Sequence, residues 1–273
     1  FCENDSFSPN VQGAKTKFKL NLKMEENQNL ENQLKQLEMQ FNATKQRLGN
    51  KFGTQKFIVY FQSFTNTYAP FSTLKALYEK ALSFENVIGL SIGTRTDCVT
   101  DEILDYLVEL SKDKEIWIEF GIQSFFDETL IDINRGDTAS NMRYWINRSK
   151  EKGLNVCGHL IYGLPKETQE MMLETFRQTV ELKVDSIKFH PLYVVKNTLL
   201  TNEFRKGRFT PISEELYIDT VVKSIKNLPE NISIQRITAG IDDSSLLSPD
   251  WCRDKHTQMK NIRLALEKEG FNY

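Results

Sequence analysis

The sequence of 273 residues predicts an α/β protein in which helices cover a parallel β-sheet, as an α/β barrel or a doubly wound sheet. Three observations lead to this class. Apolar runs typical of buried strands alternate with amphipathic helical segments, and the links between them are short. No stretch rich in Pro, Gly and Ser divides the chain. We therefore expect a single domain over residues 1–273.

The expected elements follow one another regularly along the chain. An amphipathic helix covers residues 25–48, where Leu30, Leu34, Leu37 and Phe41 recur at helical spacing and predict one buried stripe. The expected strands cover residues 56–62, 87–92, 115–121, 154–161, 185–190 and 232–236. The other helices are expected at residues 71–83, 100–110, 138–152, 167–182, 213–228 and 254–269.

Two of these helix ends carry local signals. Thr100 predicts the N-cap of the helix that follows it, because its hydroxyl oxygen can accept a hydrogen bond from a free backbone N–H group of the first turn. Gly153 predicts the end of the helix before it, because glycine adopts the left-handed conformation that commonly ends helices.

The composition excludes several classes of protein. With 35 Lys and Arg against 37 Asp and Glu, the net charge is −2, so no strongly basic field indicates a nucleic acid partner, although a local patch could bind one. No run approaches about 18 apolar residues, and the N-terminal residues lack a signal-peptide pattern. Four Cys are too few for a disulfide scaffold and fit a reducing compartment. We expect a cytoplasmic protein without a membrane partner.

Polar residues follow five of the expected strands at their carboxyl ends. In parallel α/β folds these ends meet at one edge of the sheet, where ligands bind. One such run is explained by loop capping alone. Five at one edge favour a cradle for a ligand that carries hydroxyls, an amine and a carboxylate. The runs are residues 62–70, 91–97, 119–124, 158–165 and 188–198.

The histidines and cysteines leave their roles open. His159 lies within an apolar strand, where a hydrogen-bonded core imidazole and a ligand contact are equally compatible with the sequence. The three His have no carboxylates at metal-ligand spacing, which argues against a zinc site. Cys98, Cys157 and Cys252 also lack ligand spacing, so each is expected to be a buried thiol.

Several motifs, taken in their order, point to a known family. Ile161–Thr168, Glu119–Ser124 and Ile133–Gly136 resemble runs of the radical S-adenosylmethionine (SAM) superfamily, including the oxygen-independent coproporphyrinogen oxidases and the Elongator catalytic subunit. Phe61–Pro70, Gly89–Cys98 and His190–Thr198 are similar to the YhcC-like branch of small radical SAM proteins. The resemblance covers essentially the whole chain.

The resemblance implies a more specific fold. It implies a partial (β/α)6 TIM-like barrel of the radical SAM type, with a barrel core over residues 1–200 and a C-terminal extension of one strand and helices over residues 201–273. Phe1 and Cys2 look like the tail of the cluster-binding loop, so the first strand and most of that loop would be missing. Cys2 would be the last of three thiolates that hold a [4Fe–4S] cluster, whose fourth iron binds SAM.

The same resemblance implies that the first two polar strand ends bind SAM. Gln62, Thr65 and Asn66 fall where other members use a Gly-rich strand end to meet the methionyl amine. Ser91 and Arg95 fall at the strand end that reaches the ribose or the carboxylate.

Three further SAM contacts are implied later in the chain. Gln123 matches a glutamine that lies near the ribose. Arg135 resembles the arginine that pairs with the SAM carboxylate, for which the planar guanidinium is suited. His159 takes the place of an acid in the coproporphyrinogen oxidases.

The implied activity is that of a radical SAM enzyme. Its reduced cluster, supplied with electrons by a donor such as flavodoxin or ferredoxin, cleaves SAM to methionine and a 5′-deoxyadenosyl radical that abstracts a substrate hydrogen. Similarity to the Elongator subunit implies tRNA as substrate, modified at a wobble uridine, whereas similarity to the coproporphyrinogen oxidases implies a small metabolite. For tRNA, the residues expected to meet phosphate are Lys196, Arg205, Lys206 and Arg208.

Two other functions remain open. One is a ligand-binding barrel without a cluster. The other is a Schiff-base lyase that uses Lys188 or Lys196, because a lysine near a strand end of a barrel can act as the nucleophile.

Overall fold

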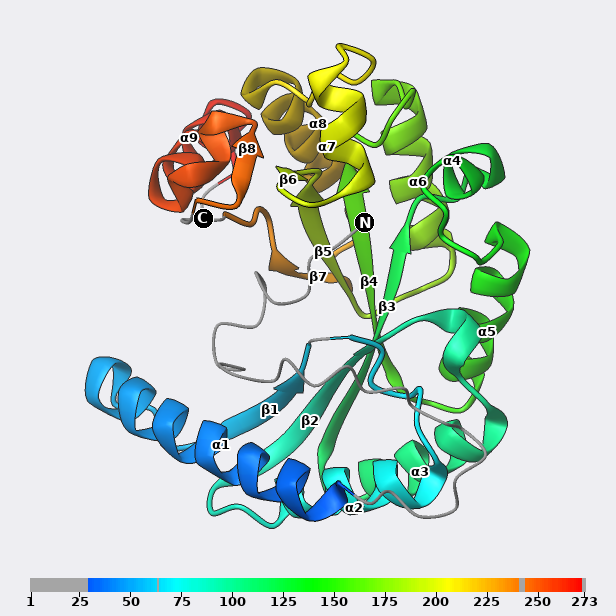
Figure 1. The fold of residues 1–273 in the computed structure, drawn as a ribbon, viewed down its shortest axis with the longest axis vertical. Coiled ribbons are helices and arrows are strands. Elements are labelled where there is room, and N and C mark those ends of the chain that lie inside the picture. Colours follow the sequence, from blue (N-terminus) through cyan, green and yellow to red (C-terminus); the bar gives the residue numbers. More distant parts are fainter. Residues whose placement is uncertain (1–28, 63, 241–243, 272–273) are drawn as a thin grey trace.

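A six-stranded parallel sheet forms the centre of the protein. The computed structural model describes residues 29–62, 64–240 and 244–271. The strands follow the order β1-β2-β3-β4-β5-β7, and every neighbouring pair is parallel. The sheet curls into a half barrel with β1 and β7 at its two edges (Figure 1). The strands are β1 Phe57–Phe61, β2 Val87–Thr94, β3 Glu115–Gln123, β4 Asn155–Tyr162, β5 Ser186–Pro191 and β7 Ser233–Arg236.

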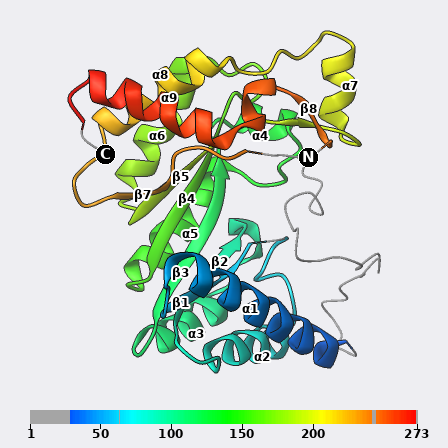
Figure 2. The same cartoon turned by 90° about the vertical axis from the view of Figure 1, so that its left-hand side faces the viewer.

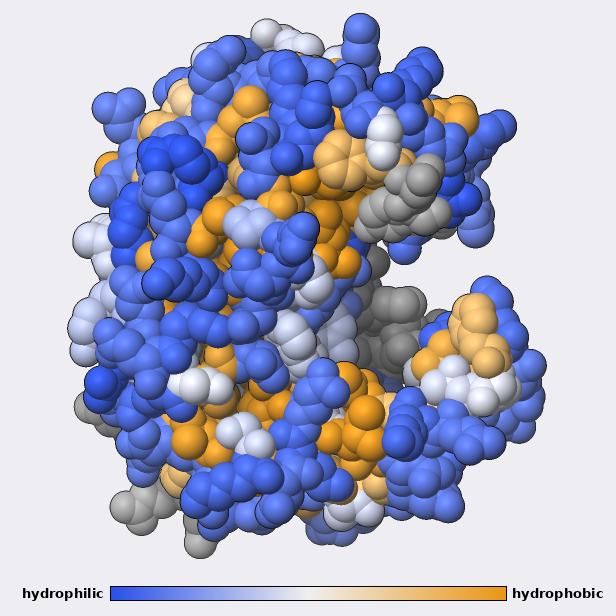
Figure 3. Space-filling view, turned by 180° about the vertical axis from the view of Figure 1, so that it is seen from behind, coloured by the Kyte–Doolittle hydropathy of each residue, from blue (hydrophilic) through white to orange (hydrophobic). Residues whose placement is uncertain are grey.

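Helices cover the convex face and the ends of this sheet. Figure 2 shows α1, α2 and α3 grouped at the end of β1 and β2, and α6, α8 and α9 at the other end. From behind, the surface is notched between the side of α1 and the side of α9 (Figure 3). The helices are α1 Leu30–Phe52, α2 Phe71–Leu82, α3 Asp101–Ser111, α4 Asp127–Asp132, α5 Ala139–Glu151, α6 Gln169–Glu181, α7 Leu199–Arg205, α8 Glu214–Lys226 and α9 Lys255–Lys268.

The two faces of the sheet differ in chemistry because successive side chains of a strand point to opposite faces. On β3, Ile116, Ile118 and Phe120 are fully buried beneath the helices of the convex face. Glu119 lies between them in sequence and therefore projects from the concave face. The apolar core thus occupies the convex side and leaves the concave side to polar groups.

The predicted helix caps are confirmed. The Thr100 hydroxyl accepts a hydrogen bond from the backbone N–H group of Ile103. Thr138, expected as the first helical residue, is instead the N-cap of α5 and accepts a hydrogen bond from the backbone N–H group of Asn141. Gly153 follows α5 with φ of 83° in the left-handed region, where a residue with a Cβ is strained. Local chemistry of single residues therefore sets these helix ends.

The predicted stripe on the first helix is only half-buried. Of the expected range, residues 25–28 lie outside the described residues, and α1 has no fully buried residue. Phe41 is half-buried and stacks on Phe84 with 4.5 Å between ring centroids, so α1 packs along the β1 side without entering the core.

Several short elements escape the sequence patterns. α4 and α7 have six and seven residues, too few for a helical period to stand out. β6 Val194–Val195 pairs with β8 Leu246–Ser248 in an antiparallel ladder over a long separation in sequence. Two 3₁₀ helices, Thr96–Cys98 and Asp250–Arg253, are equally short.

Gly89 allows β2 and β3 to pair closely. A Cβ built on Gly89 would lie 2.0 Å from the backbone oxygen of Glu115, which cannot move without breaking the ladder. We expect Gly89→Ala to lower the free energy of unfolding by about 3 kcal/mol or more, measured by urea denaturation.

The matched control for this prediction is Gly49→Ala in α1. A Cβ there meets only the Thr54 backbone oxygen, at 3.9 Å. Alanine favours the helix over glycine, so the control should gain up to about 1 kcal/mol. Equal effects of the two substitutions would contradict the close pairing of β2 and β3.

Candidate functional site

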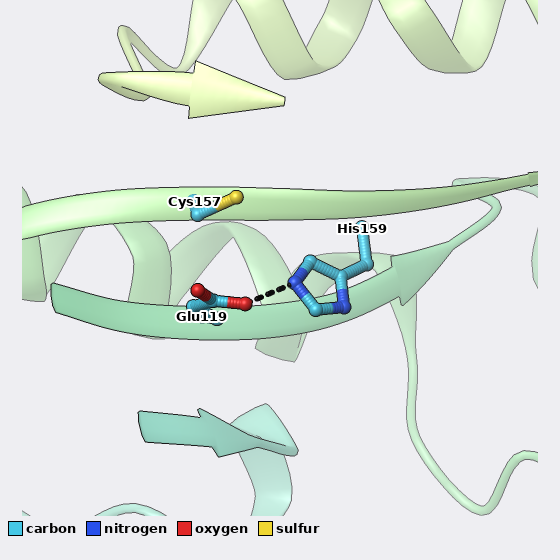
Figure 4. A group of neighbouring side chains, drawn as sticks. All are labelled: Glu119, Cys157 and His159. Carbon is cyan, nitrogen blue, oxygen red and sulfur yellow. Dashed lines mark hydrogen bonds and ion pairs between the residues drawn. The ribbon is translucent and has the colours of Figure 1, made fainter. Parts of the chain in front are cut away.

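The buried carboxylate of Glu119 lies at the centre of the concave face. Its side chain accepts hydrogen bonds from Ser91 on β2 and Lys188 on β5, and it lies 2.6 Å from Nε2 of His159 on β4. Glu119 is 1% exposed and Lys188 is 7% exposed. Figure 4 shows Glu119 and His159 facing each other from neighbouring strands, with Cys157 beside them. One carboxylate thus joins three other strands.

The ionisation of this cluster follows from its contacts. Burial alone would raise the pKa of Glu119, but the hydrogen bond from His159 and the charge and hydrogen bond of Lys188 outweigh it, so the pKa lies well below its usual range. Burial lowers the pKa of His159 despite the opposing effect of Glu119. A neutral His159 therefore donates through Nε2–H to the ionised carboxylate, and its Nδ1 is an acceptor turned away from Glu119 (Figure 4).

Lys188 is the cation that balances Glu119. Its Nζ pairs with the carboxylate and lies 4.3 Å from the centre of the Tyr60 ring, a distance that allows a cation–π contact. Burial raises the pKa of Tyr60 above its usual range, and the charge of Glu119 adds to this effect. Tyr60 is therefore a neutral phenol, and Lys188 is the ion-pair partner of Glu119.

Three side chains here have the spacing of metal ligands. The donor atoms of Glu119, Cys157 and His159 lie within 4.8 Å of one another, which corrects the expectation that no carboxylate lies near a histidine. However, Lys188 already pairs with Glu119, and burial raises the pKa of Cys157 to about 12, so the thiol is protonated. The carboxylate already has a cation as its partner, and a protonated thiol is not a metal ligand, so we assign no metal to this group.

Arg135 lies in the loop after α4, where its side chain contacts β3 near the carboxyl end of that strand. It is 9% exposed, and its Nη2 donates to the backbone oxygen of Gly121 over 2.6 Å. Its Nε is buried and has no hydrogen-bond partner among the described residues. Arg95 donates to the Arg135 backbone oxygen over 2.7 Å and forms two bonds to Asp97, so the loop that carries Arg135 is fixed.

The other predicted residues of the first strand end are arranged differently. Asn66 donates through Nδ2 to the backbone oxygens of Phe61 and Gly93, both over 2.9 Å, and thereby joins the ends of β1 and β2. Thr65 is half-buried, and Gln62 is exposed directly after β1. The structure thus gives Asn66 a role in holding the strand ends together.

The remaining predicted residues fall into three places. Ser91 and His159 belong to the Glu119 cluster. Gln123 ends β3 in the left-handed region, with φ of 69°, and is half-buried. Cys2 lies outside the described residues. Cys157 and Cys252 are buried as expected, but Cys98, the last residue of the 3₁₀ helix after β2, is only half-buried.

The sequence does not indicate that Glu119 and Lys188 belong to the same site on the concave face. Glu119 lies within a motif that resembles the superfamily but implies no role for it, and the sequence suggests Lys188 only as a nucleophile. Their pairing joins residues 69 positions apart, which the sequence alone does not bring together. The signal that was available is their type, because an acid and a lysine inside otherwise apolar strands need a partner.

Comparison with known families identifies the chain. The family model described as the Radical SAM superfamily matches residues 11–179. The chain belongs to the radical SAM superfamily. The Radical SAM C-terminal domain matches residues 184–268 of the same chain. This radical SAM protein is therefore an enzyme of that superfamily, and its half barrel is the expected fold.

Individual relatives support the expected branch. The chain is 38% identical to protein YhcC of Escherichia coli over 218 residues, covering 79% of this chain and 70% of the relative. It is 34% identical to protein YtqA of Bacillus subtilis over 231 residues, covering 85% and 72%. The resemblance to the YhcC-like branch is confirmed.

The Elongator relatives are more distant. Elongator complex protein 3 of Saccharomyces cerevisiae is 25% identical over 69% of this chain and 36% of its own length. The structure of Elp3 from Methanocaldococcus infernus matches 86% of this radical SAM chain with a TM-score of 0.73 and 21% identity, which shows a shared fold. The match spans 60% of that archaeal chain.

A helix that crosses a bilayer needs about 20 consecutive, predominantly apolar residues. Within the part of the chain that the structure describes, no helix is both long enough and apolar enough to cross a bilayer.

The ion pair between Glu119 and Lys188 makes a prediction for stability. Glu119→Gln leaves the buried ammonium without a counter-charge, and Lys188→Met removes the main cation from the carboxylate. Each should lower the free energy of unfolding by about 3 kcal/mol in urea at neutral pH. The double variant removes both charges, so its loss should be clearly smaller than the sum of the two single losses. Additive losses would show that the two charges do not interact.

Proposed function

We propose that this radical SAM enzyme binds SAM at the carboxyl edge of its sheet, with Arg135 holding the methionyl carboxylate. The observation that carries the proposal is the buried Nε of Arg135, which has no hydrogen-bond partner among the described residues. A buried guanidinium nitrogen without a partner costs free energy, and a carboxylate oxygen would satisfy it. The membership of the superfamily supports SAM as the source of that carboxylate.

The surroundings of Arg135 suit this cofactor. A Cβ at Gly121 would lie 3.3 Å from Nη2 of Arg135, so the glycine keeps room around the guanidinium. Arg95 and Gln123 come from strand ends at this edge, and Ser91 lies within β2; all three remain proposed contacts of the amino acid and the ribose. Asn66 already uses its side-chain amide to hold the ends of β1 and β2 together. We therefore propose that Gln62 and Thr65 contact the cofactor through their backbone groups.

The cluster would be held by thiolates, of which Cys2 is the proposed member in this chain. When bound, a reduced [4Fe–4S] cluster supplies the electron with which SAM is cleaved to methionine and a 5′-deoxyadenosyl radical. The chain's own residues position the reactants. His159 offers its Nδ1 as a hydrogen-bond acceptor from the neutral ring, and the apolar convex core excludes water from behind the sheet.

A tRNA is the substrate that the surface supports best. Lys196, Arg205 and Lys206 are exposed and form no ion pair with described residues, whereas Arg208 is held by Glu203 through two bonds of 2.6 and 2.5 Å. Lys196 and Arg205 line a surface pocket of about 390 Å³. A relative that is 27% identical over 56% of this chain is named tRNA uridine(34) acetyltransferase, which supports the same class of substrate.

The proposed SAM site predicts a selective loss of affinity. Arg135→Gln should weaken binding of SAM about 10- to 100-fold, because it removes a charge-assisted hydrogen bond to the carboxylate. Its affinity for decarboxylated SAM should match that of the unsubstituted protein. Equilibrium dialysis of anaerobically reconstituted protein measures both ligands.

The control for this experiment is Arg177→Gln, an exposed arginine of α6 that pairs with Glu174 and Glu181. It should leave both affinities unchanged. If Arg135→Gln weakens both ligands equally, Arg135 does not hold the carboxylate. Failure of the reconstituted protein to form 5′-deoxyadenosine under reducing conditions would overturn the proposed chemistry.

The tRNA proposal predicts a change in salt dependence. The double substitution Lys196→Ala and Arg205→Ala should weaken binding of bulk tRNA and reduce the slope of log affinity against log salt by about 2. Filter binding at several salt concentrations measures this slope. Lys35→Ala on α1 is the control and should leave it unchanged. A small metabolite becomes the better candidate if the double variant binds tRNA with the same slope.

A further inference from the structure

Arg236 is a cation of the concave face to which the proposed mechanism gives no role. It is the last residue of β7, the edge strand of the half barrel, and it pairs with Lys188 in the register of β5 and β7. Its side chain is half-buried, and its Nε is buried without a hydrogen-bond partner among the described residues. Within the described residues, Arg236 forms neither an ion pair nor a side-chain hydrogen bond.

The electrostatic neighbours of Arg236 place it beside the Glu119 cluster. Burial lowers the pKa of His190 to about 3, and the charge of Arg236 is the next largest cause. The same charge also acts on His159 and on Tyr60. Arg236 therefore faces the interior of the half barrel together with side chains of β1, β4 and β5.

No carboxylate of the described concave face is left for Arg236. One oxygen of Glu119 accepts from Ser91, and the other is shared by His159 and Lys188. Lys188 and Arg236 thus bring two positive charges against the single negative charge of Glu119. The concave face carries a local excess of one positive charge although the whole chain has a net charge of −2.

We propose that Arg236 binds an oxyanion, a carboxylate or a phosphate, carried by the substrate inside the half barrel. The planar guanidinium offers paired N–H donors that match either group, and shielding from water strengthens the contact. Arg135 lies in the loop after α4, beside β3, whereas Arg236 ends β7 at the far edge of the sheet, so we assign the first site to the cofactor and the second to the substrate. This inference rests on the proposed function for the identity of the cofactor, but the anion site itself does not depend on SAM.

Arg236 would have a distinct signature in the absence of an anion. A guanidinium kept without a partner reduces stability, whereas an arginine that serves the fold increases it. Arg236→Met should therefore leave the unfolding temperature unchanged or raise it in chloride buffer. A clear fall in the unfolding temperature would assign Arg236 to the fold and overturn the proposal.

The binding test uses inorganic phosphate and malonate as probes, each at about 100 mM and compared with chloride at equal ionic strength. In the unsubstituted protein at least one probe should raise the unfolding temperature by about 4 °C. Arg236→Met should lose this rise, Arg236→Lys should keep part of it, and Arg177→Gln should keep all of it. A preference for phosphate indicates a phosphorylated substrate, and a preference for malonate indicates a carboxylic acid.

Two results would overturn the anion site. One is the absence of any rise in the unsubstituted protein, and the other is an equal rise in Arg236→Met. Binding of SAM provides a separate readout, because Arg236→Met should leave the SAM affinity unchanged. A tenfold loss of SAM affinity in this variant would show that Arg236 serves the cofactor. Failure of SAM to bind at all would count against the proposed function and leave the anion result standing.

Discussion

A single ionised carboxylate organises the interior of the half barrel. Glu119 on β3 is almost fully buried, and it is held by a hydroxyl from β2, an imidazole from β4 and an ammonium from β5. These partners come from strands that are already joined by backbone hydrogen bonds, so the carboxylate fixes their side chains rather than the strands themselves. Removal of any one partner leaves a buried charge with fewer contacts, which ties the geometry of the concave face to one residue.

The polar groups of the concave face are of two kinds: those with hydrogen-bond or ion-pair partners, and those without. Around Glu119 the described charges are matched, and the neutral His159 and protonated Cys157 add none. At the edge, Arg135 and Arg236 keep buried nitrogens without partners among the described residues. The paired groups around Glu119 hold one another in place, and the unpaired nitrogens of the two arginines are available to ligands. Such incomplete pairing is typical of a binding site, because the ligand supplies the missing partners.

Local patterns predicted the elements well, because short-range chemistry sets them. Thr100 caps its helix as the sequence indicates, and the six strands lie where apolar runs predict them. The Glu119 cluster could not be predicted in the same way. Its contacts depend on the register between β3, β4 and β5, which no local pattern encodes. The position of Arg236 on the concave face could not be predicted either, because a single charged residue at the end of a short strand is usually exposed.

Glu119 holds its partners on the concave face in place, while Arg135 is the proposed binding group for the cofactor. An anaerobic crystal structure of the reconstituted protein with SAM tests this most directly. The account predicts that Nε of Arg135 donates to the methionyl carboxylate and that Glu119 keeps Ser91, His159 and Lys188 as partners. A structure in which Lys188 leaves Glu119 to bind SAM, while Nε of Arg135 remains without a partner, would contradict it.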